Sequence, residues 1–237
     1  MIDVVYILGN GSTWQDNELR LSLRSLQEYV SGIGKVFLIG HKPGFISDEV
    51  IHIPYKDVYP NKARNIMSKV YRAAGDERLS ENFMFWNDDY FALKRFSANK
   101  YPYYYKCDLR HSAMINRGEY KLHCDATLKI LTDNGLPYKN FDCHYPIIYN
   151  KQKMREMVDK FDWNTRHGYI LRSMYCNFYG IPGEIKKDCK TNTALPATHI
   201  PKLVENNHFL SIGENGLNAA MKEYLKKRFP IKSIYEI

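Results

Sequence analysis

The sequence predicts an α/β protein whose mostly parallel sheet is covered by helices on both faces. Short apolar runs alternate with amphipathic helical segments across residues 1–93, which is the pattern of parallel strands joined by crossover helices. Residues 94–237 are less regular. Because no repeat, low-complexity tract or clear linker interrupts the 237 residues, we expect one domain (1–237) with an α/β half over 1–93 and a more helical C-terminal half over 94–237.

The first half contains four predicted strands and two predicted helices. The strands cover residues 3–8, 35–40, 49–53 and 82–86. The first helix, over 16–30, has apolar residues spaced along one face, at Leu19, Leu23, Leu26 and Val30. The second helix begins after Asn61, which is a good N-cap, and extends to residue 74. Residues 90–93 are predicted to be extended rather than helical.

In the second half, helical patterns cover residues 125–133, 151–161, 169–179 and 217–228, with proline and glycine between them. Residues 94–117 carry six basic side chains against one acidic side chain, and tyrosines lie between them. The basic residues are Lys94, Arg95, Lys100, Lys106, Arg110 and Arg117. Cations for phosphates and rings for base stacking are the components of a nucleic-acid groove. A solvated rim with tyrosines packed inward is the alternative.

The composition is that of an ordinary globular protein, with 44% hydrophobic and 25% charged residues. The net charge of +8 permits a polyanionic partner without requiring one. Five cysteines without a C-x-x-C pair argue against a disulfide framework or a zinc site. The N-terminus lacks the features of a secretory signal, and no apolar run approaches the ~20 residues of a membrane span. We therefore expect a soluble, cytoplasmic protein with no membrane span.

Two loops follow strands at the place where open α/β sheets bind ligands, beyond the carboxyl ends of the strands. The loop Gly9-Asn10-Gly11-Ser12 lets the backbone approach a ligand closely, and a flexible turn is the alternative. The fourth strand ends at Asp88 and Asp89. Adjacent carboxylates repel each other, and a hard cation such as Mg²⁺ or Mn²⁺ relieves that repulsion. A pair of helix caps is the alternative, but no good helix follows.

Histidines and arginines of the second half are further candidates. His144 lies just before Tyr145-Pro146, and the proline holds the chain extended, which suits a side chain aimed into a cleft; a structural histidine is the alternative. Either His199 or His208 could supply a late metal ligand beside Asp88 and Asp89, with His208 as the expected one, unless they lie on the surface. Arg166 and Arg172 lie near or on the predicted helix 169–179. Their guanidinium groups match phosphate oxygens, although an exposed helical arginine is common.

Several of these segments resemble the Stealth family. They are Ile2-Asp3-Val4-Val5-Tyr6 with Asn10-Gly11-Ser12, residues 16–26, the Asn-Asp-Asp segment 85–91, and His144-Tyr145-Pro146 followed by Asn150-Lys151 and a helix with Met154. That family includes microbial capsule sugar-phosphate transferases and the enzyme that adds N-acetylglucosamine-1-phosphate to lysosomal glycoproteins. Its catalytic core is GT-A-like, a Rossmann-type arrangement. The chain also resembles, more faintly, glycosyltransferases encoded by bacteriophages, which would place it in a host cytoplasm.

The resemblance implies roles for individual residues. Asn10 and Gly11 would lie at the nucleotide, Asp88 and Asp89 at the diphosphate and metal, and His144 at the reacting phosphate or the acceptor. Arg166 aligns best with the later arginine of the family, and Arg172 is second. The expected catalytic residues are Asp89, His144, Arg166 and Arg172. The expected nucleotide-binding residues are Gly9, Asn10, Gly11, Arg20, Asn65 and Asp88.

These residues predict a transferase that uses Mn²⁺ or Mg²⁺ and a nucleotide-diphospho-sugar donor, with a UDP-sugar first. Its acceptor would be a hydroxyl group on a glycan or on a modified DNA base. We favour glycosyl transfer because the chain lacks the acidic residue usual after the family's first glycine loop, and lacks the accessory regions of long phosphotransferases. The alternatives are a Stealth-type sugar-1-phosphate transferase and a nucleic-acid-binding α/β protein without enzymatic activity.

Overall fold

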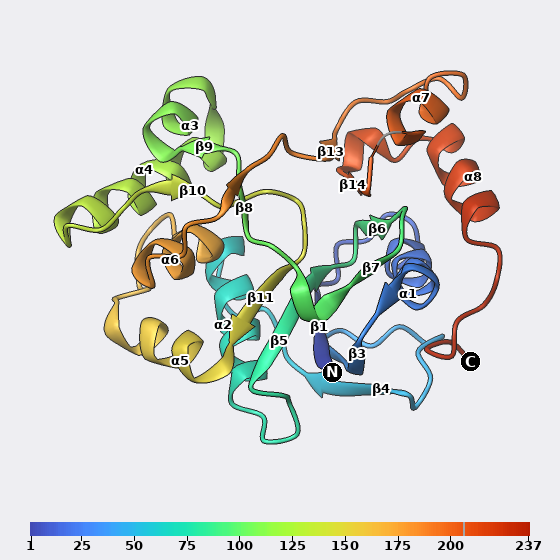
Figure 1. The fold of residues 1–237 in the computed structure, drawn as a ribbon, viewed down its shortest axis with the longest axis horizontal. Helices are drawn as coiled ribbons and strands as arrows, with labels where there is room; N and C mark the ends of the chain where they lie inside the picture. The colour runs from blue at the N-terminus through green and yellow to red at the C-terminus, as the bar shows by residue number, and fades with distance from the viewer. Residues whose placement is uncertain (206) are drawn as a thin grey trace.

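The computed structural model describes residues 1–205 and 207–237. Its centre is a five-stranded sheet in the order β11-β5-β1-β3-β4, drawn in Figure 1. These strands are β1 (Ile2–Leu8), β3 (Ile33–Gly40), β4 (Val50–Pro54), β5 (Asn82–Asn87) and β11 (Ile147–Asn150). The first four are parallel, whereas β11 is antiparallel to β5. The prediction of a mostly parallel sheet is therefore confirmed.

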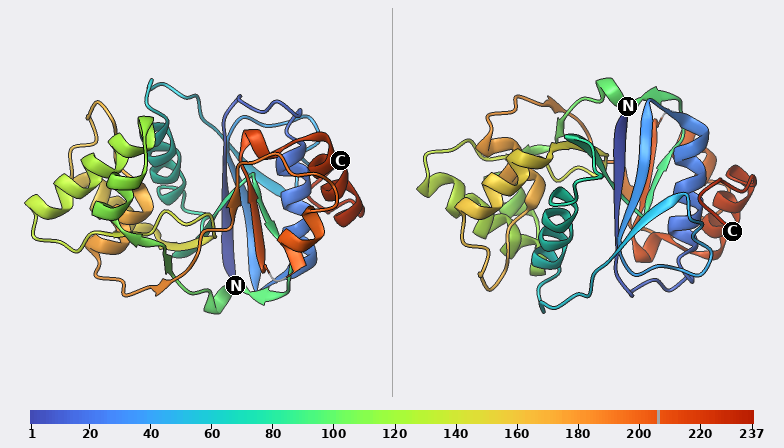
Figure 2. Two further views of the ribbon diagram at one scale, coloured as in Figure 1. Left: turned by 90° about the horizontal axis from the view of Figure 1, so that it is seen from above. Right: turned by 90° about the horizontal axis from the view of Figure 1, so that it is seen from below.

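Helices cover both faces of this sheet, as the sequence predicted. Side chains alternate along β1, so Val4 and Tyr6 pack with helix α1 (Asn17–Tyr29) on one face, while Val5 packs with helix α2 (Lys62–Ala74) on the other. The chain runs outward from β1 to β4 and then returns to the opposite side of β1. Right-handed crossovers in opposite directions place their helices on opposite faces, and Figure 2 shows α1 and α2 on the two sides of the strands.

The two predicted helices of the first half are confirmed with small changes at their ends. Leu19, Leu23 and Leu26 of α1 are buried. This helix begins after Asp16, which has a left-handed φ of 55° and makes no side-chain cap. The side chain of Asn61 accepts a hydrogen bond from the backbone N–H of Arg64 at 3.1 Å, so the predicted N-cap of α2 is present.

The second half is more helical than the sequence predicted. Helices α3 (Leu109–Ile115), α4 (Gly118–Asp133), α5 (Lys151–Lys160) and α6 (Leu171–Phe178) lie on the α2 side of the sheet. Helix α3 lies inside the basic stretch, and α4 begins seven residues before the predicted start at 125. Helix α8 (Ala219–Arg228) begins after 217 because a 3₁₀ turn, η2 (Glu214–Gly216), precedes it. Helix α7 (Ile200–Glu205) was not predicted.

A small sheet returns the C-terminal half to the end of β5. It consists of β13 (Lys190–Thr191), β14 (Phe209–Ile212) and β6 (Tyr90–Ala92), with β14 between the other two. The predicted extended chain over 90–93 is thus a strand. Short pairs complete the fold: β2 (Val30–Ser31) with β7 (Phe96–Ser97), β8 (Tyr104–Tyr105) with β12 (Glu184–Ile185), and β9 (Cys107–Asp108) with β10 (Lys139–Asn140). The 3₁₀ turn η1 (Ala98–Lys100) follows β7.

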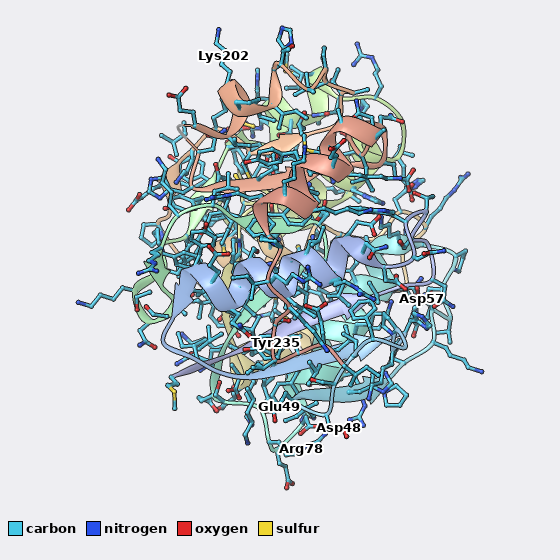
Figure 3. The ribbon with its side chains drawn as sticks, turned by 90° about the vertical axis from the view of Figure 1, so that its right-hand side faces the viewer. Asp48, Glu49, Asp57, Arg78, Lys202 and Tyr235 are labelled. Atoms are coloured by element: carbon cyan, nitrogen blue, oxygen red, sulfur yellow. The ribbon has the colours of Figure 1, made fainter. Side chains whose placement is uncertain are left out.

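The C-terminal segment is fastened to the first helix and to the loop before β4. Glu236 accepts hydrogen bonds from the Arg24 guanidinium at 2.8 and 2.9 Å. The backbone carbonyl of Tyr235 accepts a bond from Ser47 N–H at 3.0 Å, and Figure 3 labels Tyr235 beside Glu49 in the same region. Among the residues that the structure describes, no helix is long and apolar enough to cross a membrane.

Candidate active site

The strand order fixes where a ligand site belongs in this sheet. Strands β1 and β5 are neighbours, but the chain leaves β1 toward β3 on one side and reaches β5 on the other. Ligands of open α/β sheets bind at such a switch point, beyond the carboxyl ends of the strands. Gly9 follows β1 and Asp88 follows β5, so both predicted loops flank this point.

Asp89 is held in place on one carboxylate oxygen and is unpaired on the other. Its Oδ2 accepts a hydrogen bond from Ser211 Oγ at 3.0 Å and lies 3.4 Å from Lys190 Nζ. Its Oδ1 is buried and has no hydrogen-bond partner within residues 1–205 and 207–237. A buried acceptor without a partner is costly, so this oxygen is suited to a ligand that brings a positive charge.

Asp88 is in an environment that disfavours its charged form. Burial, and after it the negative charges of Asp89 and Glu18, raise the pKa of its carboxyl group to about 7. The charge of Lys62 lowers the pKa but does not compensate. Two carboxylates that repel each other at a strand end are a donor set that Mg²⁺ or Mn²⁺ would neutralise. The residues present therefore fit the cation that the sequence predicted.

His144 is fixed in its orientation by an acidic partner. Its Nδ1 is 2.8 Å from Asp188 Oδ2, and its backbone N–H donates to Asp188 Oδ1 at 3.0 Å. Lys106 Nζ lies 3.5 Å from the same carboxylate. Burial would raise the pKa of Asp188, but the hydrogen bonds and charge of His144 and the charge of Lys106 hold it below its usual value. The carboxylate therefore stays ionised and keeps the imidazole in one orientation.

One short segment connects His144 to the paired carboxylates. Asp188 holds His144, while Lys190, two residues further on, approaches Asp89. Between them, Cys189 Sγ donates to the backbone carbonyl of His144 at 2.9 Å. The rings of Tyr90 and His144 also meet edge to face, with centroids 6.3 Å apart. The structure thus brings together three predicted residues, Asp88, Asp89 and His144.

Arg172 lies behind this site. It is 6% exposed, and its Nη1 donates to the backbone carbonyls of Cys143, at 2.8 Å, and Tyr145. Its Nη2 donates to Tyr90 Oη at 2.9 Å. The guanidinium therefore holds the turn that carries His144. Arg166, in contrast, has an exposed side chain in the loop before α6, and its backbone carbonyl accepts a bond from Asn61 Nδ2 at 3.1 Å.

The glycine loop is open on its outer side. Asn10 and Gly11 are exposed, and a Cβ built on Gly11 would meet no atom within 4 Å. At Gly9 a Cβ would lie 3.3 Å from Asp57 Oδ2. Asp57, labelled in Figure 3, is itself 2.7 Å from Lys69 Nζ. The loop therefore offers backbone rather than side chains at the switch point.

Arg20 and Asn65 contact neighbouring parts of the chain. Arg20 stacks on the Phe45 ring at 4.2 Å, and its Nε lies 3.9 Å from Glu236 Oε2. The side-chain amide of Asn65 is occupied by the backbone of Tyr59, accepting at 3.0 Å and donating at 2.7 Å. Both residues hold loops at the carboxyl edge of the sheet.

The structure does not bring His208 to the paired carboxylates. His208 is exposed at the start of β14, and its backbone carbonyl pairs with Leu93 N–H. Ser211, at the other end of this strand, holds Asp89. The expected third ligand thus lies three residues before Ser211, about 10 Å along the strand at ~3.3 Å per residue. In the described parts of the chain, no group of three or more His, Cys, Asp or Glu residues is arranged as a metal site.

Sequence reasoning missed three residues that complete the site, Asp188, Lys190 and Ser211, and it assigned Lys106 to a candidate nucleic-acid groove instead. Asp188 and Lys190 are close in the sequence, in Lys187-Asp188-Cys189-Lys190, but no spacing links them to residues 88–89 or 144. The available signal for these two residues was weak: Asp188 lies two positions before Lys190 in a stretch without a helical pattern.

Comparisons with known proteins show likeness only at the level of structure. No family model matches the chain, and neither does any curated protein. The galactosyltransferase LgtC, solved with donor and acceptor sugar analogues, has a TM-score of 0.49 and 10% identity over 98% of each chain. Mouse xyloside xylosyltransferase 1 has a TM-score of 0.45 and 8% identity, over 92% of this chain and 100% of the other.

A glycosyltransferase involved in the glycosylation of the major capsid of PBCV-1 has a TM-score of 0.43 and 12% identity, over 95% of this chain and 98% of the other. Likenesses of this size establish neither an activity nor a substrate for this chain, and the Stealth resemblance stays a prediction. The fold and the site themselves define an α/β protein with paired carboxylates at the switch point of a mostly parallel sheet and a histidine linked to them through residues 188–190.

Proposed function

We propose that this protein is a GT-A-like glycosyltransferase that uses a nucleotide-diphospho-sugar and a divalent cation. One observation carries the proposal: Asp88 and Asp89 stand at the switch point of the sheet with one buried carboxylate oxygen unpartnered among the described residues. Burial and charge repulsion raise the pKa of Asp88 to about 7. Such a pair is unfavourable by itself and becomes favourable when a cationic ligand binds.

Asp88 and Asp89 would hold Mn²⁺ or Mg²⁺. When bound, the cation would neutralise the charge of the donor diphosphate as it becomes the leaving group. Ser211 and Lys190 orient Asp89, and the Lys190 ammonium adds positive charge on the same side. The exposed backbone of Asn10 and Gly11 leaves space for the nucleotide. Arg166 is a further candidate for contact with the donor, because its exposed side chain lies in a loop bonded to the start of α2.

His144 is suited to act as the general base on the acceptor hydroxyl. Its Nδ1 is engaged by Asp188, which leaves Nε2 as the nitrogen able to take a proton. The acceptor oxygen would lose that proton to Nε2 while it forms a bond to the anomeric carbon, and the bond from that carbon to the diphosphate would break. Arg172 acts through the turn that carries His144 and is a positioning residue in this scheme. The acceptor would be a hydroxyl of a glycan or of a modified DNA base.

The first experiment is a thermal-shift panel of UDP-, GDP-, ADP- and dTDP-sugars with and without Mn²⁺. Binding to the folded state raises stability by RT ln(1 + [L]/Kd), about 2.7 kcal/mol at one hundred times Kd. One donor should raise the melting temperature only when Mn²⁺ is present. Asp89→Asn should abolish that shift. The matched control is Asp48→Asn, because Asp48 is fully exposed beside Lys42 and labelled in Figure 3. No shift with any donor, or an equal shift in Asp89→Asn, contradicts the proposal.

The second experiment identifies the bond that breaks. The donor that binds is labelled in its β-phosphate and incubated with acceptors. Release of the label with the nucleotide supports glycosyl transfer. Retention of the label on the product indicates sugar-1-phosphate transfer instead, in which His144 would deprotonate a hydroxyl that attacks phosphorus. His144→Gln should retain the donor-induced shift and lose turnover in either case.

A nucleic-acid-binding protein without enzymatic activity makes the opposite predictions. Its affinity for DNA would fall steeply with salt and would not change in Asp88→Asn or Asp89→Asn. The basic stretch 94–117 does not present all of its groups to solvent, because Tyr101 and Tyr104 pack with Phe96 and Tyr145. Lys106 is engaged by Asp188. These contacts favour the enzyme.

A further inference from the structure

A hollow of about 200 Å³ lies outside the site described above. Its floor is aromatic and includes Phe96, Tyr101, Tyr104 and Phe209. These rings brace each other, with centroids 5.0 Å apart for Phe96 and Tyr101 and 5.2 Å apart for Phe96 and Phe209. The floor is therefore formed before any ligand arrives, and it is apolar.

The rim of this hollow is basic. Lys100, Lys186 and His208 line it, and no acidic residue is among its described lining residues. The Lys186 ammonium lies 4.0 Å from the centre of the Tyr104 ring and 4.9 Å from that of Tyr145. Partial burial lowers the pKa of His208, and the charges of Lys94 and Lys186 lower it further. The opening is thus a region of positive potential above an apolar floor.

The hollow adjoins the catalytic base without being part of its site. Tyr145 follows His144, and its hydroxyl donates to the backbone carbonyl of Lys187 at 3.0 Å. Lys186 is two residues from Asp188, which holds His144. On the other side, β14 connects His208 at the hollow to Ser211 at Asp89. A ligand here would touch both segments that carry the proposed catalytic groups.

We propose that this hollow binds an anionic pyranose, a sugar ring that carries a carboxylate or a phosphate. The C–H face of the ring would rest on the aromatic floor, and the anionic group would pair with Lys100 and Lys186. A neutral sugar lacks the negative charge that pairs with the lysines, and inorganic phosphate lacks the C–H face that rests on the aromatic floor. An anionic sugar has both features, so its affinity should exceed that of a neutral sugar or of phosphate. This binding requires neither the donor nor the metal of the proposed transferase.

The test is titration calorimetry with glucose 6-phosphate, glucuronate, glucose and inorganic phosphate, in EDTA and without nucleotide. At least one anionic sugar should bind about tenfold more tightly than glucose and phosphate, as one charge-assisted contact provides. Glucose 6-phosphate and glucuronate distinguish a phosphate from a carboxylate. Lys186→Gln and Lys100→Gln should each weaken binding about tenfold. The control with the same charge change is Lys232→Gln, because Lys232 is exposed and does not line the hollow.

Equal weakening by Lys186→Gln and Lys232→Gln would show attraction by net charge alone and would overturn the proposal. So would anionic sugars that bind no more tightly than glucose or phosphate. Asp89→Asn separates this proposal from the proposed function. Binding in the hollow should be unchanged in Asp89→Asn, whereas binding lost in Asp89→Asn and kept in Lys186→Gln would place the sugar at the carboxylates and refute the hollow.

Discussion

Asp88→Asn should stabilise the metal-free protein at pH 8, although it removes one of the two carboxylates proposed to hold the cation. In the folded protein, burial first and then the charges of Asp89 and Glu18 raise the pKa of Asp88 to about 7. A carboxyl group whose pKa is raised on folding contributes stability below its unfolded pKa, near 3.9, and that stability is lost as pH rises through 7. Above pH 7, the ionised carboxylate therefore opposes folding.

The size of this effect follows from the two pKa values. Each pKa unit corresponds to about 1.4 kcal/mol, so a difference of about three gives an upper bound of about 4 kcal/mol. Asp88 keeps part of its surface exposed, and solvent screens part of this penalty. We expect Asp88→Asn to raise the free energy of unfolding by about 1–2 kcal/mol at pH 8. At pH 4 the wild-type carboxyl is protonated in the folded state, so the two proteins should be nearly equal.

The assay is urea denaturation in EDTA at pH 4, 6 and 8, with Asp48→Asn as the exposed control. A gain of 1–2 kcal/mol moves the urea midpoint by roughly 0.5 M, given an m-value of about 3 kcal/mol/M. Adding Mn²⁺ at pH 8 should reverse the order, because the cation stabilises the wild type through its two carboxylates. If Asp88→Asn is less stable than the wild type at pH 8 in EDTA, the electrostatic account of the site is wrong.

Four further changes test the surrounding structure. Asp188→Asn should lower the free energy of unfolding, measured by urea denaturation, by about 1–3 kcal/mol. It should also abolish turnover while Mn²⁺-dependent donor binding persists. Lost donor binding would contradict a role of Asp188 that is limited to holding His144. Arg172→Lys should lower the free energy of unfolding, measured in thermal melts, by about 2 kcal/mol or more, because one ammonium cannot reach the acceptors on Cys143, Tyr145 and Tyr90. A fully stable variant with weaker donor binding would instead indicate that Arg172 contacts the ligand. Burial raises the pKa of Glu236, but Arg24 and Ser233 hold it below its usual value, so Glu236→Gln should cost about 1–3 kcal/mol above pH 5. That difference should disappear as pH falls through the lowered pKa of the wild-type carboxyl, and a pH-independent difference would refute it. Gly11→Ala should change stability by less than about 0.5 kcal/mol, since its Cβ meets no atom, but should weaken donor binding in the thermal-shift panel; unchanged donor binding would place the donor elsewhere.

The local features of this protein could be predicted because they depend on neighbouring residues. The continuous apolar run that includes Val4, Val5 and Tyr6 predicts a strand covered on both faces, and Asn61 predicts a helix start. The pair Asp88-Asp89 could be identified for a similar reason. Two carboxylates next to each other at a strand end repel each other whatever the rest of the fold, so the hypothesis of a bound cation follows from the sequence.

The partners of that pair could not be predicted, because they come from distant parts of the chain. Ser211 is 122 residues from Asp89, and Asp188 is 44 residues from His144. The same limit explains why the roles of Arg172 and His208 could not be predicted correctly from the sequence. Helical position alone does not distinguish an arginine exposed to phosphate from one buried against two carbonyls, and β14 places His208 beside Leu93 rather than beside Asp89.

The sequence by itself therefore determined the main strands and helices of residues 1–93, the burial of their faces and the position of the paired carboxylates, since each depends on interactions within a few residues. Only the tertiary structure decided what surrounds those carboxylates. The reversal of strand order at β1 and β5 creates the switch point, and the return of β13 and β14 delivers Asp188, Lys190 and Ser211 to it. Those contacts form only when segments more than forty residues apart pack against one sheet, and a local sequence pattern does not predict such packing.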